Sequence, residues 1–329
     1  MSLGLPTLLA LLAALALDAL VGDPERLWRH LPHPVALIGR LVGRLDRRLN
    51  DPRLSDRRRR VHGFAAAAVI VGVPAAIAGA LQAALLALLP LPLALAAIAV
   101  VAAILLAQRS LDEHVAAVAA GLEADGLAGG RRAIALVVGR DPERLDEAGV
   151  ARAAIETTAE SFCDGVVAPA FWFALLGLPG IAAYKAANTA DSMIGHRTPR
   201  HEAFGCAAAR LDDVLNLVPA RLAGLLVALA APVAGGRVAR ALAVMRRDAP
   251  KHASPNAGWP EAAMAGALDL ALIGPTVYDG VADDKPWFNA EGRRTAVGAD
   301  IGRGLAVYRS ACGLHAALYA ALAAAWALA

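Results

Sequence analysis

The sequence has few cysteines and few aromatic residues, and it lacks the short motifs of the common soluble enzyme classes. Its 329 residues include three cysteines and only 5% aromatic side chains. The cysteines form no C-x-x-C pair and no zinc-ligand spacing, which argues against a disulfide framework or a zinc site and favours a reducing environment. No G-x-x-x-x-G-K-[ST] loop, H-E-x-x-H helix or G-x-S-x-G elbow occurs, so the chain is not a P-loop enzyme, a zincin or an α/β-hydrolase of the usual kind.

Charge is absent from long stretches of the chain. No ionisable residue lies between Phe64 and Ala107. One membrane-spanning helix needs about 20 apolar residues, so this run is long enough for two, and Pro90 and Pro92 mark the turn between them. With 58% hydrophobic residues and a mean hydropathy of +0.52, and with few strand signals, the composition predicts an all-α polytopic integral membrane protein.

We expect four to six membrane segments joined by helical cytoplasmic loops, in a single membrane-embedded catalytic domain over residues 1–329. No Lys or Arg precedes the first segment, as it would in a signal peptide, so we expect that segment to be retained. Pro169 and the sequence GLPG interrupt the fourth, which favours a re-entrant hairpin over a full span. The expected segments are 3–21, 64–88, 91–107, 166–183, 217–236 and 311–328.

The net charge of +3 arises from clustered arginines, many of them between Gly22 and His62. Beside a membrane segment, such a cluster indicates a cytoplasmic loop by the positive-inside rule. A nucleic-acid partner is the weaker alternative, because the arginines are not interleaved with a series of aromatic residues. We therefore expect active loops on the cytoplasmic side and no nucleic-acid partner.

Three acidic residues, Glu156, Glu160 and Asp164, stand four residues apart directly before an apolar segment. On a helix they form one stripe, and like charges at this spacing destabilise an isolated helix. Carboxylates without His or Cys partners suit Mg²⁺, which usually brings a phosphate group with it. A solvated helix face is the alternative, but it is less expected beside a membrane-like segment. We predict a metal site at these three residues.

A second group of polar residues follows the apolar segment 166–183. Lys185 is suited to neutralise a phosphate or acyl-phosphate oxygen, and Asn188 and Ser192 are suited to donate hydrogen bonds. A capped loop is the alternative explanation. Further along, Arg210 and Asp213 fit an ordinary intrahelical ion pair, which leaves the neighbouring acid unexplained. The group consists of Lys185, Asn188, Asp191, Ser192, Arg210, Asp212, Asp213 and Asn216.

Two further segments place polar residues beside apolar ones. The first lies just past segment 3–21, and the second lies at a turn before a helix that we expect to start near Pro260. Turn and capping roles explain several of these residues, and contact with a large ligand is the alternative. They are Asp23, His33 and Arg40 in the first segment, and Asn256, Trp259 and Glu261 in the second.

Several long motifs occur in one order along the chain, and together they carry a family resemblance. They are GDP, HPV and IGR near the N-terminus, then AIETTAESFCDGVVAPAFW, GLPGIAAYKAANTADSMIGH, FGCAAARLDDVLNLVPARL and APKHASPNAGWPEAAMAGAL. Over essentially its whole length the chain resembles the adenosylcobinamide-phosphate synthase (cobinamide synthase) family of cobalamin biosynthesis.

The resemblance implies a multi-pass inner-membrane ligase that uses ATP and Mg²⁺. Such an enzyme joins a propionate carboxylate of the corrinoid adenosylcobyric acid to (R)-1-amino-2-propanol, or to its O-phosphate, through an amide bond. The expected partners are these two substrates, membrane lipid, and other membrane enzymes of cobalamin assembly.

The candidate residues suit that chemistry, because phosphoryl transfer depends mainly on charge neutralisation and positioning. A carboxylate such as Asp191 is suited to take a proton from the attacking ammonium group. We assign catalysis to Lys185, Asp191, Arg210 and Asp213, ATP binding to Asn188, Ser192, Asp212 and Asn216, metal binding to Glu156, Glu160 and Asp164, and substrate binding to Asp23, His33, Arg40, Asn256, Trp259 and Glu261.

Two other classes of protein are weighed against the ligase. A transporter of a corrinoid or another solute would place ionisable groups at mid-membrane, whereas the strongest apolar segments have none. A non-catalytic membrane scaffold would not need six acids and Lys185 near the interface. The sequence leaves open whether the amine is phosphorylated and whether the carboxylate is activated as an acyl phosphate or an acyl adenylate.

Overall fold

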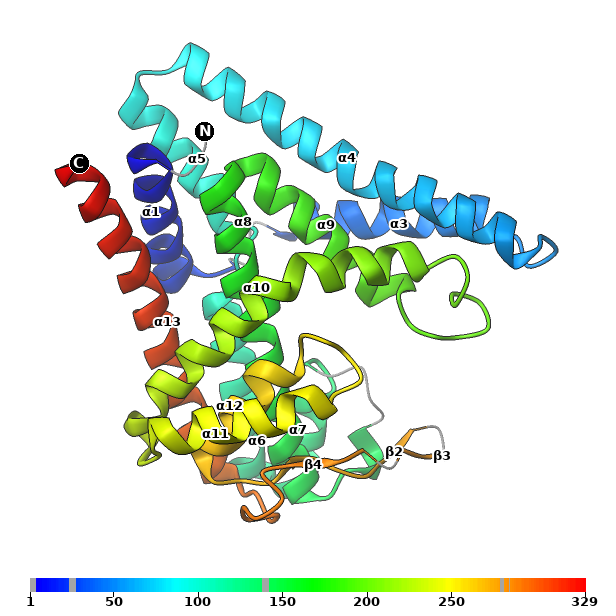
Figure 1. The fold of residues 1–329 in the computed structure, drawn as a ribbon, viewed down its shortest axis with the longest axis vertical. Coiled ribbons are helices and arrows are strands. Elements are labelled where there is room, and N and C mark those ends of the chain that lie inside the picture. Colours follow the sequence, from blue (N-terminus) through cyan, green and yellow to red (C-terminus); the bar gives the residue numbers. More distant parts are fainter. Residues whose placement is uncertain (1–3, 24–27, 138–141, 279–280, 284) are drawn as a thin grey trace. The chain divides into compact units, whose positions relative to one another are not determined.

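The computed structural model describes residues 4–23, 28–137, 142–278, 281–283 and 285–329. Helices make up almost all of this part of the chain, and the strands are four short segments (Figure 1). The chain divides into two compact units, which are described separately. The first comprises Met1–Ala107, Ala168–Asn216 and Tyr319–Ala329, and the second comprises Gln108–Val167 and Leu217–Leu318.

Within its described residues, the first unit has helices joined by turns and loops, and no strand. Proline stands in the first turn of four of its helices, where a missing N–H costs no hydrogen bond. The unit also takes in the beginning of α10 (Cys206–Ala230) and the end of α13 (Gly298–Leu328). Its complete helices are α1 (Leu5–Val21), α3 (Pro34–Leu49), α4 (Asp56–Leu88), α5 (Leu91–Ala103), α8 (Ala168–Leu176) and α9 (Leu178–Ile194).

Helices α8 and α9 pack against each other as a hairpin that turns at Gly177. This glycine has a φ of 71°, in the left-handed region that side chains rarely adopt. The buried amide of Gln82 on α4 accepts a hydrogen bond from the Leu178 N–H at 2.8 Å. Gln82 thereby caps the first turn of α9, whose N–H groups have no partner within the helix.

The apolar core of the first unit lies between α3, α4 and α9. Ile38 and Val42 on α3 pack with Ile70 on α4, Ala186 on α9 and Phe204 in the segment before α10. Small side chains allow the helices to approach closely here. A Cβ atom added at Gly63 on α4 would lie 2.0 Å from the carbonyl oxygen of Phe204, well inside van der Waals contact.

The second unit contains most of the remaining elements. The helices are α6 (Gln108–Ile134), η1 (Pro142–Arg144), α7 (Glu147–Phe162), the π-helical turn η2 (Cys163–Val167), η3 (Ala231–Ala234), α11 (Val238–Asp248), η4 (Ala249–Lys251) and α12 (Gly258–Leu268), together with the end of α10 and most of α13. The strands β1 (Leu272–Ile273) and β4 (Trp287–Phe288) pair antiparallel, as do β2 (Thr276–Tyr278) and β3 (Val281–Asp283).

The core of the second unit combines close backbone contacts with a few large side chains. On α12, a Cβ added at Gly266 would lie 2.8 Å from the Cα of Ala241 on α11, so these two helices meet through small residues. On α7, the ring of Phe162 stands edge-on to the ring of Tyr308 on α13, and the two ring centres are 5.6 Å apart. The Tyr308 hydroxyl donates to the Gln108 carbonyl at 2.7 Å, which satisfies a polar group within the apolar surroundings.

Five helical stretches within the described residues are long and apolar enough to cross a membrane: Asp56–Leu88, Leu91–Ile134, Glu147–Leu176, Cys206–Ala234 and Gly298–Leu328. They contain or overlap the expected segments 64–88, 91–107, 217–236 and 311–328. Segment 3–21 corresponds to the shorter apolar helix α1. The apolar side chains of Phe64, Ile77 and Leu88 on α4 are 55%, 65% and 80% exposed, as suits a lipid-facing helix.

The prediction of an all-helical multi-pass membrane protein is confirmed by these helices. The structure also explains the interruption that the sequence shows within the apolar segment 166–183, because α8 ends and α9 begins on either side of Gly177. The re-entrant path of this segment, the single catalytic domain and the cytoplasmic side of the loops stay predictions.

We predict that Gly63→Ala destabilises the protein by about 1–3 kcal/mol, because the added methyl group overlaps the Phe204 carbonyl. Gly72→Ala on the same helix is the matched control, since nothing lies within 4 Å of its Cβ position. That variant should be neutral or slightly stabilising. The measurement is the thermal unfolding midpoint of the detergent-purified protein. Equal midpoints for the two variants would contradict the close approach at Gly63.

Candidate functional site

The acidic stripe lies on α7 and the turn that follows it. The expected helix is present, but it changes to a π-helical turn at Cys163, so Asp164 follows Glu160 with altered geometry. Single π-helical turns occur often at functional sites. Glu156 is buried, and its Oε1 accepts a hydrogen bond from the Ile273 N–H at 2.7 Å. Glu160 is exposed and Asp164 is half-buried, so these two carboxylates are the more accessible members of the stripe.

Within the described part of the chain, no three His, Cys, Asp or Glu side chains gather closely enough to hold a metal ion by themselves. Mg²⁺ is commonly held by one or two carboxylates together with the phosphates of a substrate. Glu160 and Asp164 fit that arrangement, whereas one oxygen of Glu156 is already used by the backbone of β1. The metal site therefore stays a prediction.

A chain of hydrogen bonds joins α9 to the first turns of α10 in the first unit. The Tyr184 hydroxyl donates to Asn216 Oδ1 at 3.0 Å, and Asn216 Nδ2 donates to Asp212 Oδ2 at 3.0 Å. The other Asp212 oxygen accepts from Asn188 Nδ2 at 3.3 Å. Asp212 and Asn216 are buried, so this network fixes the faces of the two helices on which the other predicted residues stand.

Asp191 follows Asn188 by one turn of α9, and its pKa is perturbed. Burial raises the pKa of the Asp191 carboxyl above its usual value, and the negative charge of Asp213 raises it further, although His196 acts in the opposite direction. A carboxyl group with a raised pKa beside a second acid is a common feature of acid–base sites. A Cβ at Gly195 would lie 1.9 Å from Asp191 Oδ1, so any larger residue at position 195 would displace the carboxylate.

The other predicted residues of this group are less enclosed. Lys185 is half-buried on α9, while Ser192 and Arg210 are exposed. The Ser192 hydroxyl donates to the Asn188 carbonyl at 3.0 Å, which is a local bond within the helix. Of the predicted substrate residues in this unit, His33 Nε2 lies 3.6 Å from Asp23 Oδ1, and the His33 Nδ1 accepts the Val35 N–H at the start of α3. Arg40 lies further along α3.

In the second unit, Asn256 and Trp259 contact Arg221, which was not among the predicted site residues. Arg221 Nη1 donates to Asn256 Oδ1 at 2.8 Å, and its guanidinium lies 4.6 Å from the centre of the Trp259 ring. Arg221 belongs to a helix that is apolar enough to cross a membrane, where a charged residue is a candidate functional group. Its isolation in an apolar run was the available sequence signal.

The predicted residue Glu261 lies beside a histidine that sequence reasoning missed. His252 Nδ1 accepts the Ser254 N–H at 2.9 Å, so the proton of the neutral ring is on Nε2, which lies 3.6 Å from Glu261 Oε2. Burial lowers the pKa of His252, which favours this neutral form. Glu261 is buried, and the pair places a proton donor and an acceptor next to the turn that carries Asn256.

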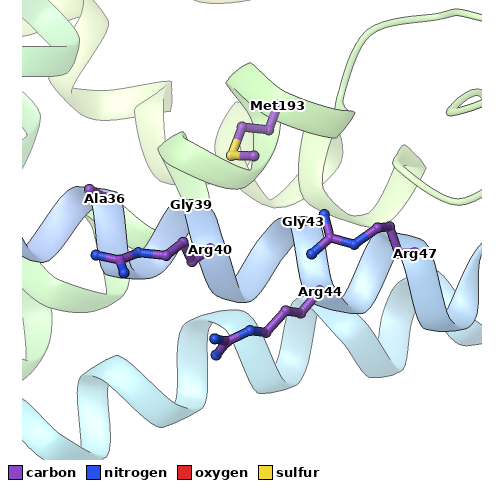
Figure 2. Close-up of a pocket in the computed structure, with 7 residues that line it drawn as sticks. All are labelled: Ala36, Gly39, Arg40, Gly43, Arg44, Arg47 and Met193. Atoms are coloured by element: carbon purple, nitrogen blue, oxygen red, sulfur yellow. The ribbon is translucent and has the colours of Figure 1, made fainter.

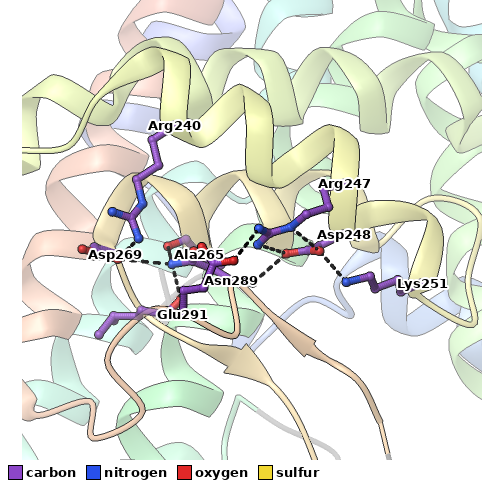
Figure 3. A network of polar contacts seen from close by, with 9 residues as sticks. Arg240, Arg247, Asp248, Lys251, Ala265, Asp269, Asn289 and Glu291 are labelled. Atoms are coloured by element: carbon purple, nitrogen blue, oxygen red, sulfur yellow. Dashed lines mark hydrogen bonds and ion pairs between the residues drawn. The ribbon is translucent and has the colours of Figure 1, made fainter.

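The turn between α11 and α12 is held by a buried aspartate (Figure 3). Asp248 is fully buried, and its carboxylate accepts two hydrogen bonds from Arg247 at 2.9 Å, one from Lys251 at 2.6 Å and one from the Asn289 N–H at 2.7 Å. Burial by itself would raise the pKa of Asp248, but these donors lower it to about 2. The network fixes the segment that leads into His252 and Asn256.

The predicted site residues thus form separate groups within the two units. Asp23, His33 and Arg40 lie in the first unit with Lys185, Asn188, Asp191, Ser192, Arg210, Asp212, Asp213 and Asn216. Glu156, Glu160, Asp164, Asn256, Trp259 and Glu261 lie in the second. The structure joins Asn188 directly to Asp212, and Asp212 directly to Asn216, whereas the roles assigned to all these residues stay predictions.

We predict that Asp248→Asn destabilises the protein by about 3 kcal/mol, because it leaves the Arg247 and Lys251 charges without their buried partner. Since the pKa of Asp248 is lowered when the protein is folded, its contribution should be present above about pH 4 and be lost as the pH falls towards 2. The measurement is the free energy of unfolding of the detergent-purified protein against pH.

Asp269→Asn is the matched control for this prediction. Asp269 is largely exposed and pairs with Arg240, and its φ of 57° is one that asparagine tolerates. An exposed ion pair contributes about 1 kcal/mol or less, so the control should change stability little. A similar loss of unfolding free energy in both variants would contradict the prediction that the buried Asp248 network stabilises the protein more than an exposed ion pair does.

Comparison with known proteins identifies the family. Residues 11–308 match the model of the CobD/Cbib protein family. The chain is 50% identical over 318 residues to the cobalamin biosynthesis protein CobD of Sinorhizobium sp, covering 96% of this chain and 98% of the relative. It is 48% identical over 322 residues to the protein of the same name from Rhizobium meliloti strain 1021, covering 96% and 97%.

A third relative, the cobalamin biosynthesis protein CobD of Brucella suis, is 49% identical over 317 residues, and the match covers 94% of this chain and 95% of the relative. No solved structure matches the chain. The family model covers most of the chain, and each of these three relatives is matched over nearly its whole length. The chain belongs to the CobD/Cbib family of cobalamin biosynthesis proteins.

Proposed function

We propose that this protein is an ATP- and Mg²⁺-dependent amide ligase of cobalamin biosynthesis. It would join a propionate carboxylate of adenosylcobyric acid to (R)-1-amino-2-propanol or to its O-phosphate, giving adenosylcobinamide or its phosphate. The observation that carries the proposal is the buried network on α9 and α10, in a chain of this family. It joins Asp212 to Asn188, which lies one turn of α9 before Asp191, whose carboxyl has a raised pKa. A membrane chain with no catalytic task would have little reason to bury these groups.

The reaction requires activation of a carboxylate, and Mg²⁺-bound ATP would supply it by phosphoryl or adenylyl transfer. Glu160 and Asp164 are the residues suited to hold the metal. Lys185 and Arg210 are suited to neutralise phosphate oxygens, and Asn188 is oriented for hydrogen bonding by Asp212. Asp191 is suited to receive the proton that the attacking ammonium must lose, and its raised pKa brings it closer to the working pH.

The Arg221, Asn256 and Trp259 group suits a different part of the reaction. A flat aromatic ring beside a guanidinium and an amide offers stacking and hydrogen bonds to a large ligand that carries amide side chains, as a corrinoid does. Asp23 and His33 stay candidates for contact with the amine substrate, because their side chains already lie next to each other. We propose the cytoplasmic side of an inner membrane for these groups, since ATP is supplied there.

The activity is tested with the full-length protein in detergent. Adenosylcobyric acid, aminopropanol or its phosphate, ATP and Mg²⁺ should yield one amide per ATP consumed, and removal of Mg²⁺ with EDTA should abolish the product until Mg²⁺ is restored. ADP with phosphate indicates an acyl phosphate, whereas AMP with pyrophosphate indicates an acyl adenylate. If no amide forms with any nucleotide, while proteoliposomes accumulate the corrinoid, the protein is a transporter and the proposal is wrong.

We predict that Asp191→Asn lowers kcat by about 100-fold or more, as expected for loss of a general base. In the unsubstituted protein, kcat should rise with pH as Asp191 loses its proton, with a midpoint above the ordinary value of 3.8. In the variant, kcat should no longer rise with pH over this range. Glu202→Gln, an exposed carboxylate in the same unit, is the matched control and should keep both the rate and the profile. An unchanged profile in Asp191→Asn would remove this residue from the mechanism.

A further inference from the structure

A groove of about 440 Å³ lies along α3 in the first unit (Figure 2). Three arginines of α3, Arg40, Arg44 and Arg47, line it together with small residues of the same helix. Met193 of α9 completes the lining, and its sulfur would lie 3.4 Å from a Cβ placed at Gly39. The groove therefore combines a row of positive charges with a surface of small and apolar groups.

The arginines of the groove differ from the other charges near α3. Arg40, Arg44 and Arg47 follow each other at helical spacing on the side of α3 away from the buried Ile38 and Val42. All three are exposed, and within the described residues none of them forms an ion pair. The one acidic residue of the helix, Asp46, is buried and is neutralised instead by Arg200 at 2.7 Å. Within the described residues of this unit, no ion pair thus compensates the positive charge of the groove.

The position of α3 brings this charge close to a membrane surface. Six residues separate the end of α3 at Leu49 from the start of α4 at Asp56, and α3 packs directly against α4. The uncharged part of α4 begins at Phe64, and Val61 and Phe64 are exposed by 62% and 55%. Basic side chains at the entry of an apolar helix lie at the level of lipid headgroups, where anionic phospholipids attract them.

We infer that the groove binds the phosphate group of one anionic phospholipid. Arg40, Arg44 and Arg47 donate hydrogen bonds to the phosphate oxygens, and Ala36, Gly39 and Met193 contact the glycerol and the first carbons of the acyl chains. A volume of about 440 Å³ suits a drug-sized ligand, so it is large for a lone phosphate ion. This role differs from the substrate contact predicted for Arg40, and it does not depend on the proposed ligase activity.

The experiment titrates the full-length detergent-purified protein with dioleoyl phosphatidylglycerol or dioleoyl phosphatidylcholine and counts bound lipids by native mass spectrometry. We expect one phosphatidylglycerol to bind more tightly than phosphatidylcholine. The double variant Arg44→Gln with Arg47→Gln should weaken phosphatidylglycerol binding about thirtyfold, from about fivefold per arginine near an anionic lipid. Arg57→Gln with Arg58→Gln is the control, because it removes the same charge from exposed positions on the first turn of α4. It should weaken binding by less than about threefold.

A second variant guards against misfolding of the double variant. Met193→Glu places a negative charge on the opposite wall of the groove at a side chain that is 42% exposed, and it should also weaken phosphatidylglycerol binding while the thermal midpoint stays unchanged. An equal loss in the control pair would show diffuse attraction to the whole arginine cluster and would overturn the assignment. Equal binding of the two lipids, or displacement of phosphatidylglycerol by low millimolar inorganic phosphate, would overturn it as well.

Discussion

The hydrogen bond between Gln82 and the start of α9 is the interaction on which the first unit depends. Between Phe64 and Ala107 the chain has one polar side chain, and it is used to cap the N–H of Leu178. In an apolar environment an unsatisfied N–H costs several kcal/mol, so an interrupted helix can stand there only if its free ends find partners. Gln82 meets this need, and it allows the chain to turn at Gly177 and send α9 back along α4.

The same requirement explains how the polar residues of the candidate site are held. Asn216 and Asp212 are buried on a helix that is apolar enough to cross a membrane, and they bond to each other, to Tyr184 and to Asn188. Their mutual bonds leave α9 and α10 with a defined rotation about their axes. Lys185 and Asp191 stand on α9, whose rotation about its axis these bonds fix.

The second unit uses a different arrangement for the same purpose. A buried carboxylate with several donors orients its turn before α12, and Asn289 adds bonds to the carbonyls of Ala265 in α12 and of Leu270 just after it. His252, Asn256 and Trp259 are thereby presented by a rigid turn. Arg221 reaches this turn from α10, where its charge is satisfied by Asn256 and by the face of the Trp259 ring.

Much of the fold could be predicted because its causes are local. Runs without charge, prolines at helix starts and the break at Gly177 depend on neighbouring residues, so the apolar segments and the helix of the acidic stripe were predicted from the sequence. The motifs that carry the family resemblance are contiguous segments, so they could also be recognised in the sequence. The π-helical turn at Cys163 was not, because it depends on how the whole helix packs.

The sequence by itself therefore determined the class of the protein, its apolar helical segments and its family. The tertiary structure decided which polar residues meet. It gave Glu156 a backbone partner 117 residues away at Ile273, joined Arg221 to Asn256, and set His252 beside Glu261. The two residues of each pair belong to different helices, strands or turns, and their contact follows from packing, on which hydropathy and spacing carry no information.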